Sequence, residues 1–171
     1  DIVRTAPLEA ALLRIGEALQ AGRPPPSAVC DLLLRRPPRL RGRAPGAPIL
    51  AGDPTPEAVS DAVAALSDSV LVIQGPPGTG KTHTAASCAA RLLAAGRRVA
   101  VSAHTHTAVE HLMAKVLEVA PGSVRAAKLG NRAPGPALEG AVEHVKKAAE
   151  LSPGVLLAGG TPWAFVDPDG P

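Results

Sequence analysis

Apolar residues recur along the first third of the chain at helical spacing. This spacing predicts an amphipathic helix over 7–22, and Gly22 is expected to end it. A short helix is expected over 27–34, with Ser27 as its N-cap. A third is expected over 55–66, because a threonine followed by a proline is typical of a helix start.

From residue 70 onward, short β-branched runs alternate with helical stretches. We expect strands over 70–74, 98–103, 124–129 and 154–158, and helices over 81–95, 107–120 and within 138–151. The run 70–74 is apolar throughout, as in a strand buried on both faces of a parallel sheet. This alternation predicts right-handed βαβ units, and therefore an α/β fold with a parallel sheet and flanking helices.

Composition narrows the class of protein. The 171 residues suffice for one domain with a core, and a net charge of +3 permits an acidic partner without requiring one. The two cysteines give no disulfide framework and no metal-type spacing, and Cys88 is expected to be a small buried thiol. Because no long apolar stretch or signal peptide is present, we expect a cytoplasmic protein without a membrane partner.

The candidate chemistry is concentrated in one octapeptide, Gly-Pro-Pro-Gly-Thr-Gly-Lys-Thr at 75–82. Its glycines let successive N–H groups point at phosphate oxygens, and the helix that follows directs its positive end at the same anion. Lys81 is expected to reach the β and γ phosphates, and the Thr82 hydroxyl to coordinate Mg²⁺. A glycine-rich turn that matches by chance is the alternative, and the flanking strand and helix disfavour it.

The pattern therefore predicts a nucleoside-triphosphate site, with ATP and Mg²⁺ as cofactors and with Lys81 and Thr82 as the catalytic pair. The residues expected to bind the nucleotide are Gly75, Pro76, Pro77, Gly78, Thr79, Gly80, Lys81, Thr82 and His83.

The octapeptide alone does not separate ATPase families, since AAA+ ATPases also use it. His104–Leu112 reads His-Thr-His-Thr-Ala-Val-Glu-His-Leu, and with Ile73–Gln74 and the octapeptide it resembles motifs I and Ia of superfamily 1B helicases. The closest likeness is to the branch with replication helicase-nucleases and bacterial fusions of a RecB-like nuclease to a helicase. Gly154–Phe165 looks like the strand and Gly-Gly-Thr-x-Trp-x-Phe turn before motif II in those fusions, and Asp31–Leu40 resembles their segment before the core.

This resemblance implies a division of the chain. Residues 1–54 would be a helical lead-in with an Arg/Pro-rich connector, and residues 55–171 the amino-terminal part of a RecA-like P-loop NTPase domain. Arginines in the connector form a cation cluster that either neutralises phosphates or is simply a solvated basic loop. The members of this cluster are Arg35, Arg36, Arg39, Arg41 and Arg43.

The resemblance also implies contacts with the backbone of a single-stranded nucleic acid. The residues concerned are Thr105, His106, Thr107 and Thr161. Capping of the helix and packing of the turn are the alternative roles of Thr105 to Thr107, and both roles are compatible. Trp163 either stacks on a base or packs, whereas Phe165 is expected to pack in the core.

The sequence departs from the helicase pattern in two places. No glutamine precedes the loop in Glu57–Asp61, so adenine selectivity is not supported. No Asp-Glu pair follows Thr161, and Asp167 and Asp169 in the Pro/Gly tail do not read as Walker B. We therefore expect the chain alone to turn ATP over very slowly.

Two functions remain from the sequence. The first is an ATP-dependent helicase that translocates on nucleic acid, with DNA as the expected strand. Its implied partners are the rest of the helicase core and a fused RecB-like nuclease domain. The second is an AAA+ type regulatory module that acts on proteins. The Thr-His-Thr-Ala-Val turn after strand 98–103 favours the helicase, because it has no role in AAA+ proteins.

Overall fold

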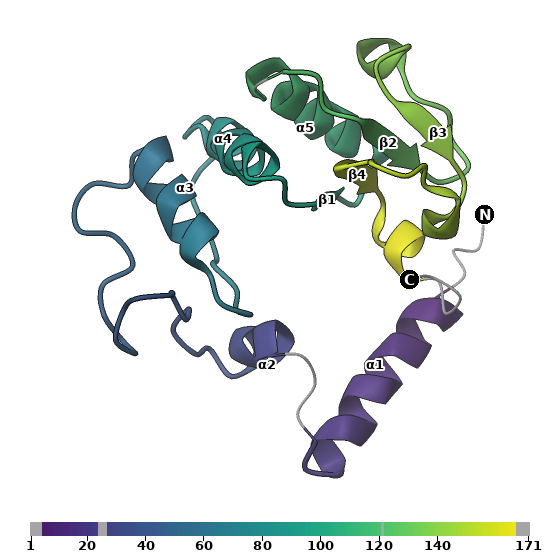
Figure 1. The fold of residues 1–171 in the computed structure, drawn as a ribbon. Coiled ribbons are helices and arrows are strands. Elements are labelled where there is room, and N and C mark those ends of the chain that lie inside the picture. Colours follow the sequence, from purple (N-terminus) through teal and green to yellow (C-terminus); the bar gives the residue numbers. More distant parts are fainter. Residues whose placement is uncertain (1–4, 24–26, 121, 167–171) are drawn as a thin grey trace.

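The structure is a computed structural model that describes residues 5–23, 27–120 and 122–166 of the chain. Its elements follow in chain order (Figure 1): α1 (Ala6–Gln20), α2 (Ser27–Leu33), α3 (Pro56–Ala65), α4 (Lys81–Ala94), β1 (Val99–Ser102), α5 (His106–Val119), β2 (Ala126–Leu129), η1 (Pro136–Leu138), β3 (Glu143–Val145), η2 (Ala148–Glu150), β4 (Leu157–Gly160) and η3 (Pro162–Phe165). The three η elements are 3₁₀ turns.

The strands of the described residues form one parallel sheet in the order β1-β4-β2-β3. Gly159 of β4 lies between Val101 of β1 and Lys128 of β2, which fixes the register of the three strands. Because all pairs are parallel, the carboxyl ends of the strands meet at one edge of the sheet. The predicted α/β fold with a parallel sheet and flanking helices is confirmed.

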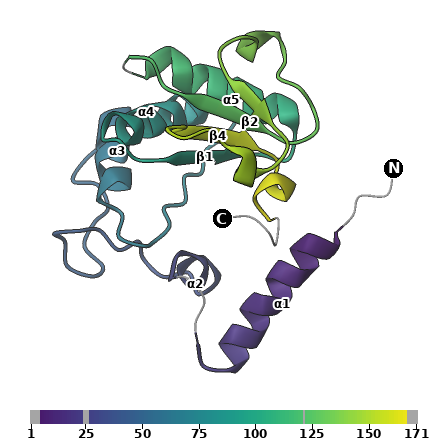
Figure 2. The same ribbon diagram turned by 45° about the vertical axis from the view of Figure 1, so that its right-hand side comes forward.

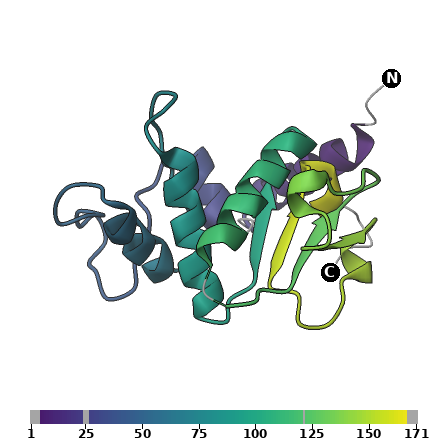
Figure 3. The ribbon, with the colours of Figure 1, turned by 90° about the horizontal axis from the view of Figure 1, so that it is seen from above.

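Helices cover one face of this sheet closely. In Figure 3, α4 and α5 lie side by side over the strands, and α3 packs against α4. The core lies between these helices and the sheet, and its buried side chains include Ala86, Leu93, Val101, Val109, Met113, Val116 and Leu157. Helices α1 and α2 lie on the other side of the sheet (Figure 2). Leu12 and Leu13 of α1 are 67% and 65% exposed there.

The helices with strong local signals lie where the apolar spacing predicts them. Thr55 caps α3 as expected, since its Oγ1 accepts a hydrogen bond from the Ala58 N–H at 3.2 Å. Pro56 takes the first helical position. Cys88 is buried within α4, as expected. The cap expected at Ser27 lies outside the described side chains.

Residues 70–74 form no strand, so the prediction of a buried strand before the loop is wrong. The segment pairs with no strand of the described residues, and β1 remains an edge strand. Val72 is 67% exposed and Ile73 is 45% exposed. β-branched residues favour extended backbone, but a strand needs a neighbour to supply its hydrogen bonds, and the described residues supply none to this segment.

The prediction of an α-helix within 138–151 is also wrong. Two 3₁₀ turns and β3 occupy this stretch, and Gly140 adopts a left-handed φ of 71° between them. β3 pairs in parallel with β2, so long-range pairing overrides the local helical pattern. The last strand was expected over 154–158. In the structure this strand is β4 (Leu157–Gly160), which begins three residues later and includes both glycines of the Gly-Gly-Thr motif.

Arginines of the connector hold it against its neighbours. Arg41 donates to two carbonyl oxygens at the end of α3, that of Leu66 at 2.8 Å. Arg43 donates to two carbonyl oxygens of its own loop, both at 2.8 Å. Arg39 forms an ion pair with Asp31 at 2.8 Å. These three guanidinium groups therefore fasten the connector instead of forming a free basic surface.

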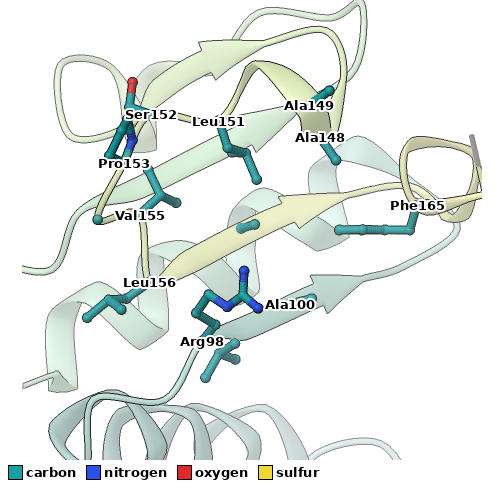
Figure 4. Close-up of a pocket in the computed structure, with 13 residues that line it drawn as sticks. Arg98, Ala100, Ala148, Ala149, Leu151, Ser152, Pro153, Val155, Leu156 and Phe165 are labelled. Atoms are coloured by element: carbon teal, nitrogen blue, oxygen red, sulfur yellow. The ribbon is translucent and has the colours of Figure 1, made fainter. Parts of the chain in front are cut away.

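A hollow of about 680 Å³ lies on the sheet face opposite α4 and α5 (Figure 4). Its apolar wall comes from Ala100 of β1, Ala158 of β4 and Leu151, and Phe165 lies along it. Phe165 is 39% exposed, so the expectation that it packs in the core is wrong. Within the described residues, no helix combines the length and the apolar character that a membrane crossing requires.

Candidate functional site

The octapeptide forms a tight loop that leads into α4. Gly78 and Gly80 have φ values of 82° and 79°, in the left-handed region that glycine adopts without strain. A Cβ on Gly75 would lie 2.7 Å from the Thr79 Oγ1, so this approach requires glycine. The Thr79 hydroxyl donates to the Pro76 carbonyl oxygen at 2.9 Å and braces the loop. A glycine-rich loop that leads into a helix suits a phosphate group, because its backbone N–H groups can approach the anion closely.

Lys81 is the first residue of α4, and its ammonium turns back over the loop. Nζ donates to the carbonyl oxygens of Gly75 at 2.7 Å and Pro76 at 2.6 Å. These acceptors are neutral, and an anionic phosphate oxygen is a stronger acceptor for the same donor. The N-cap residue, Gly80, has no side chain to cap α4, so the first N–H groups of the helix stay available for an anion.

The loop and α5 share a hollow of about 660 Å³. From the loop side it is lined by Pro77, Gly78, Gly80, Lys81, Thr82 and His83, which brings together most of the residues expected to bind nucleotide. From α5 it is lined by His111, Lys115 and Glu118. Sequence reasoning missed these three, although their spacing of three and four positions places them on one helix face.

The donor that the sequence predicts for the divalent cation accompanying the nucleotide is the Thr82 hydroxyl. Thr82 lies in the first turn of α4 and is exposed. No group of three or more His, Cys, Asp or Glu that could hold a metal is found in the part of the chain that the structure describes. The donor set therefore fits a cation that is held chiefly by phosphate oxygens and water, as Mg²⁺ commonly is.

A polar network fastens the backbone just before this loop. The buried Asp31 accepts the Ser69 hydroxyl at 2.7 Å and pairs with Arg39 at 2.8 Å. The Arg39 backbone N–H also donates to the Ser69 Oγ at 3.1 Å. These partners lower the pKa of Asp31, with the Ser69 hydrogen bond as the largest cause. The carboxylate is therefore a fixed charge that ties α2 to the entry of the loop.

The turn after β1 opens α5 with a threonine cap. The Thr105 Oγ1 accepts a hydrogen bond from the Ala108 N–H at 3.2 Å, so the expected capping is confirmed. Thr105 and Thr107 are exposed, whereas His106 is half-buried. Contact of these residues with nucleic acid stays a prediction.

Thr161 begins the turn after β4, which neighbours β1 in the sheet. Ser102 and Gly160, the last residues of the two strands, lie opposite each other. Because the strands are parallel, the turns at Thr105 and Thr161 follow the same edge of the sheet, as the sequence led us to expect. Trp163 comes directly after, within η3, and is 38% exposed.

Beneath the Thr105 turn lies a buried polar cluster that sequence reasoning did not find. Lys128 of β2 is fully buried, and its Nζ lies 3.4 Å from the Glu110 Oε1. The same ammonium donates to the carbonyl oxygens of Arg132 and Ala133. A lysine in the otherwise apolar strand Ala126–Leu129 was the sequence signal for this cluster.

The same cluster sets the charge of His106. Burial lowers the pKa of its imidazole most, and the nearby cations Lys128 and Arg132 lower it further, while Glu110 opposes them. The His106 ring is therefore neutral at neutral pH. Any cation that this edge offers to a phosphate must come from another side chain.

The comparisons with known proteins agree with this geometry. The chain matches no curated protein and no solved structure. The AAA_11 family, described as an AAA domain and found in superfamily 1 helicase-like proteins, matches residues 50–152, more than half of the chain. The matched range spans the phosphate-binding loop, the sheet strands β1 to β3 and both helices that cover them. The chain therefore belongs to the AAA_11 family of helicase-like P-loop NTPases.

Proposed function

We propose that this chain is the ATP-binding part of a superfamily 1B helicase, which couples ATP hydrolysis to movement along single-stranded nucleic acid, with DNA as the expected strand. The loop at 75–80, whose glycine backbone and Lys81 form a cradle for phosphate, supports ATP binding. The match to the AAA_11 family, which is found in superfamily 1 helicase-like proteins, is the observation that supports the helicase reading over other ATPases. The finer resemblance, to helicases fused to a RecB-like nuclease, rests on the sequence motifs alone.

The chain's own residues have distinct tasks in this function. Lys81 exchanges two carbonyl acceptors for phosphate oxygens, and the uncapped N-terminus of α4 adds N–H donors. Thr82 offers its hydroxyl to the Mg²⁺ that accompanies the nucleotide, and bound Mg²⁺ neutralises phosphate charge. Thr105, Thr107 and Thr161 present hydroxyl groups at the carboxyl edge of the sheet, where a nucleic-acid backbone is expected to lie.

The test is binding of a labelled single strand by the full-length protein, followed by fluorescence anisotropy. Replacing Thr105 and His106 by alanine is expected to weaken strand binding and leave ATP binding unchanged. Because phosphate contacts carry the binding, it should be insensitive to base sequence and weaken steeply as salt rises.

Thr55→Ala is the matched control, because Thr55 caps α3 with the same 3.2 Å hydrogen bond to the third residue of its helix. It removes an equivalent cap away from the proposed strand. If the wild-type protein binds ATP but no single strand, the helicase proposal fails and the AAA+ type regulator is favoured.

A further inference from the structure

A third turn joins the two that hold Thr105 and Thr161. The loop from Gly130 to Gly135 follows β2, which lies next to β4 in the sheet. The order β1-β4-β2 therefore places the Thr105 turn, the Thr161 turn and this loop in succession along one edge. Neither the sequence motifs nor the family match assigns a role to the loop.

The loop is held from below by Lys128. An ammonium has three N–H donors, and here they face the carbonyl oxygens of Arg132 and Ala133 and the Glu110 carboxylate. Since Glu110 belongs to α5, the lysine joins the loop to the helix that Thr105 opens. Lys128 is thus a positioning residue for the backbone of Arg132 and Ala133.

Two further contacts hold the loop Gly130–Gly135 against β3 and α5. The Gly130 N–H donates to the Val145 carbonyl oxygen at 3.0 Å, and the Gly130 carbonyl oxygen lies 2.7 Å from the His144 Nε2. A Cβ on Gly135 would lie 2.5 Å from the Glu110 Oε2. The loop therefore returns directly over the Glu110 carboxylate, which a side chain at position 135 would displace.

The buried cluster of Lys128, Glu110 and His106 under the loop leaves some of its polar atoms without hydrogen bonds, which lowers the stability of the fold. Among the side chains that the structure describes, the buried polar atoms without a hydrogen-bond partner are the His106 Nδ1 and the Glu110 Oε1. The Lys128 ion pair reaches the Glu110 Oε1 at 3.4 Å but without hydrogen-bond geometry. Unpaired buried polar atoms are costly, and such violations concentrate at functional sites.

Arg132 is the exposed cation at this place. Its guanidinium makes no hydrogen bond or ion pair with another described residue, unlike those of Arg39, Arg41 and Arg43. It lies close enough to His106 to affect the imidazole electrostatically. His106 is neutral, so Arg132 is the side chain in this cluster that can attract an anion.

We propose that the loop Gly130–Gly135 is a further contact for the sugar-phosphate backbone of a single strand, with Arg132 as its phosphate-binding cation and Lys128 as the residue that positions it. The inference rests on the proposed function, since it extends the same edge of the sheet. It adds a charged contact to a surface whose other assigned residues, Thr105, His106, Thr107 and Thr161, are uncharged at neutral pH.

The test is the salt dependence of strand binding by the full-length protein, measured by anisotropy with a labelled oligothymidylate. Each phosphate contact to a single strand contributes about 0.7 to the slope of log affinity against log salt. Arg132→Ala is expected to lower the slope by about this amount, and Arg132→Lys to keep it. Arg97→Ala is the matched control, because Arg97 is also exposed but precedes β1, at the opposite edge.

The possible outcomes distinguish a failure of this inference from a failure of the proposed helicase function. A reduced slope in Arg132→Ala alone, with unchanged ATP affinity, supports the contact. An unchanged slope in Arg132→Ala, together with weaker binding by the Thr105/His106 double variant, overturns the inference and leaves the helicase proposal standing. Equal loss in Arg132→Ala and Arg97→Ala shows a general charge effect and also overturns it. Absence of strand binding by the wild-type protein overturns both.

Discussion

Residues 70–94 and residues 99–119 each pass through a turn into a helix of 14 residues. In the first unit the segment before the turn is unpaired, and glycines shape the turn. In the second unit β1 lies in the sheet, a threonine caps the helix, and the buried Lys128 joins that helix to β2.

The difference shows two ways of presenting N–H groups to an anion. The first unit leaves the helix end without a side-chain cap, so its donors stay open to an anion such as the proposed phosphate. The second satisfies a donor with Thr105 and is complete without a ligand. Ligand dependence should therefore be concentrated in the first unit, and intrinsic stability in the second.

The largest effect is expected on stability in the second unit. Lys128→Met removes the buried cation and leaves the Glu110 carboxylate, which is 12% exposed, without its partner. Breaking such a pair costs about 3–5 kcal/mol, so the free energy of unfolding in urea should fall by that amount. Lys146→Met, at an exposed lysine, is the control. A loss below about 1 kcal/mol would mean that the cluster does not stabilise the fold.

The next effect is on ligand binding in the first unit. Lys81→Ala removes the donor over the loop, and we expect Mg·ATP affinity to fall by about 3 kcal/mol, on the order of a hundredfold. Lys81 is exposed, so thermal unfolding should change little. Calorimetry measures the affinity, with Lys146→Ala as a matched charge control. Equal ATP binding by wild type and Lys81→Ala would refute the assignment of this loop.

A smaller effect compares two equivalent caps. Thr55→Ala and Thr105→Ala each remove a side-chain acceptor 3.2 Å from the N–H of the third residue, so each should cost about 1 kcal/mol in urea unfolding. Strand affinity should fall for Thr105→Ala alone. If both variants bind the strand as the wild type does, the Thr105 turn is a helix cap and nothing more.

The smallest effect concerns the anchor of the first unit at Asp31. Its pKa is lowered below the ordinary 3.8 in the folded chain, so its stabilisation is complete above that value and is lost as pH falls through the lower folded value. The stability difference between wild type and Asp31→Asn should therefore shrink below about pH 4. Urea unfolding over an acid pH series measures it. A stability difference that stays constant with pH would show that the charge of the Asp31 carboxylate does not contribute to stability.

Local patterns predicted the parts of the fold that depend on local contacts. The caps at Thr55 and Thr105 and the glycine loop could be predicted from the sequence, because each depends on contacts with residues a few positions away. Segment 70–74 and stretch 138–151 were misread because strand formation depends on a distant neighbour. The Lys128 cluster escaped for the same reason, since its partners come from α5 and from the loop after β2.

The unpaired segment 70–74 also carries a thermodynamic consequence for the loop that it precedes. Fixing backbone costs roughly 1–2 kcal/mol per residue in conformational entropy. If nucleotide binding orders this segment together with the loop, that cost per residue is subtracted from the apparent free energy of binding. A strand that pairs with 70–74 beforehand would then raise the affinity without touching the nucleotide, because a larger fraction of molecules would be competent to bind. Pairing of 70–74 and phosphate binding would in that case be thermodynamically linked.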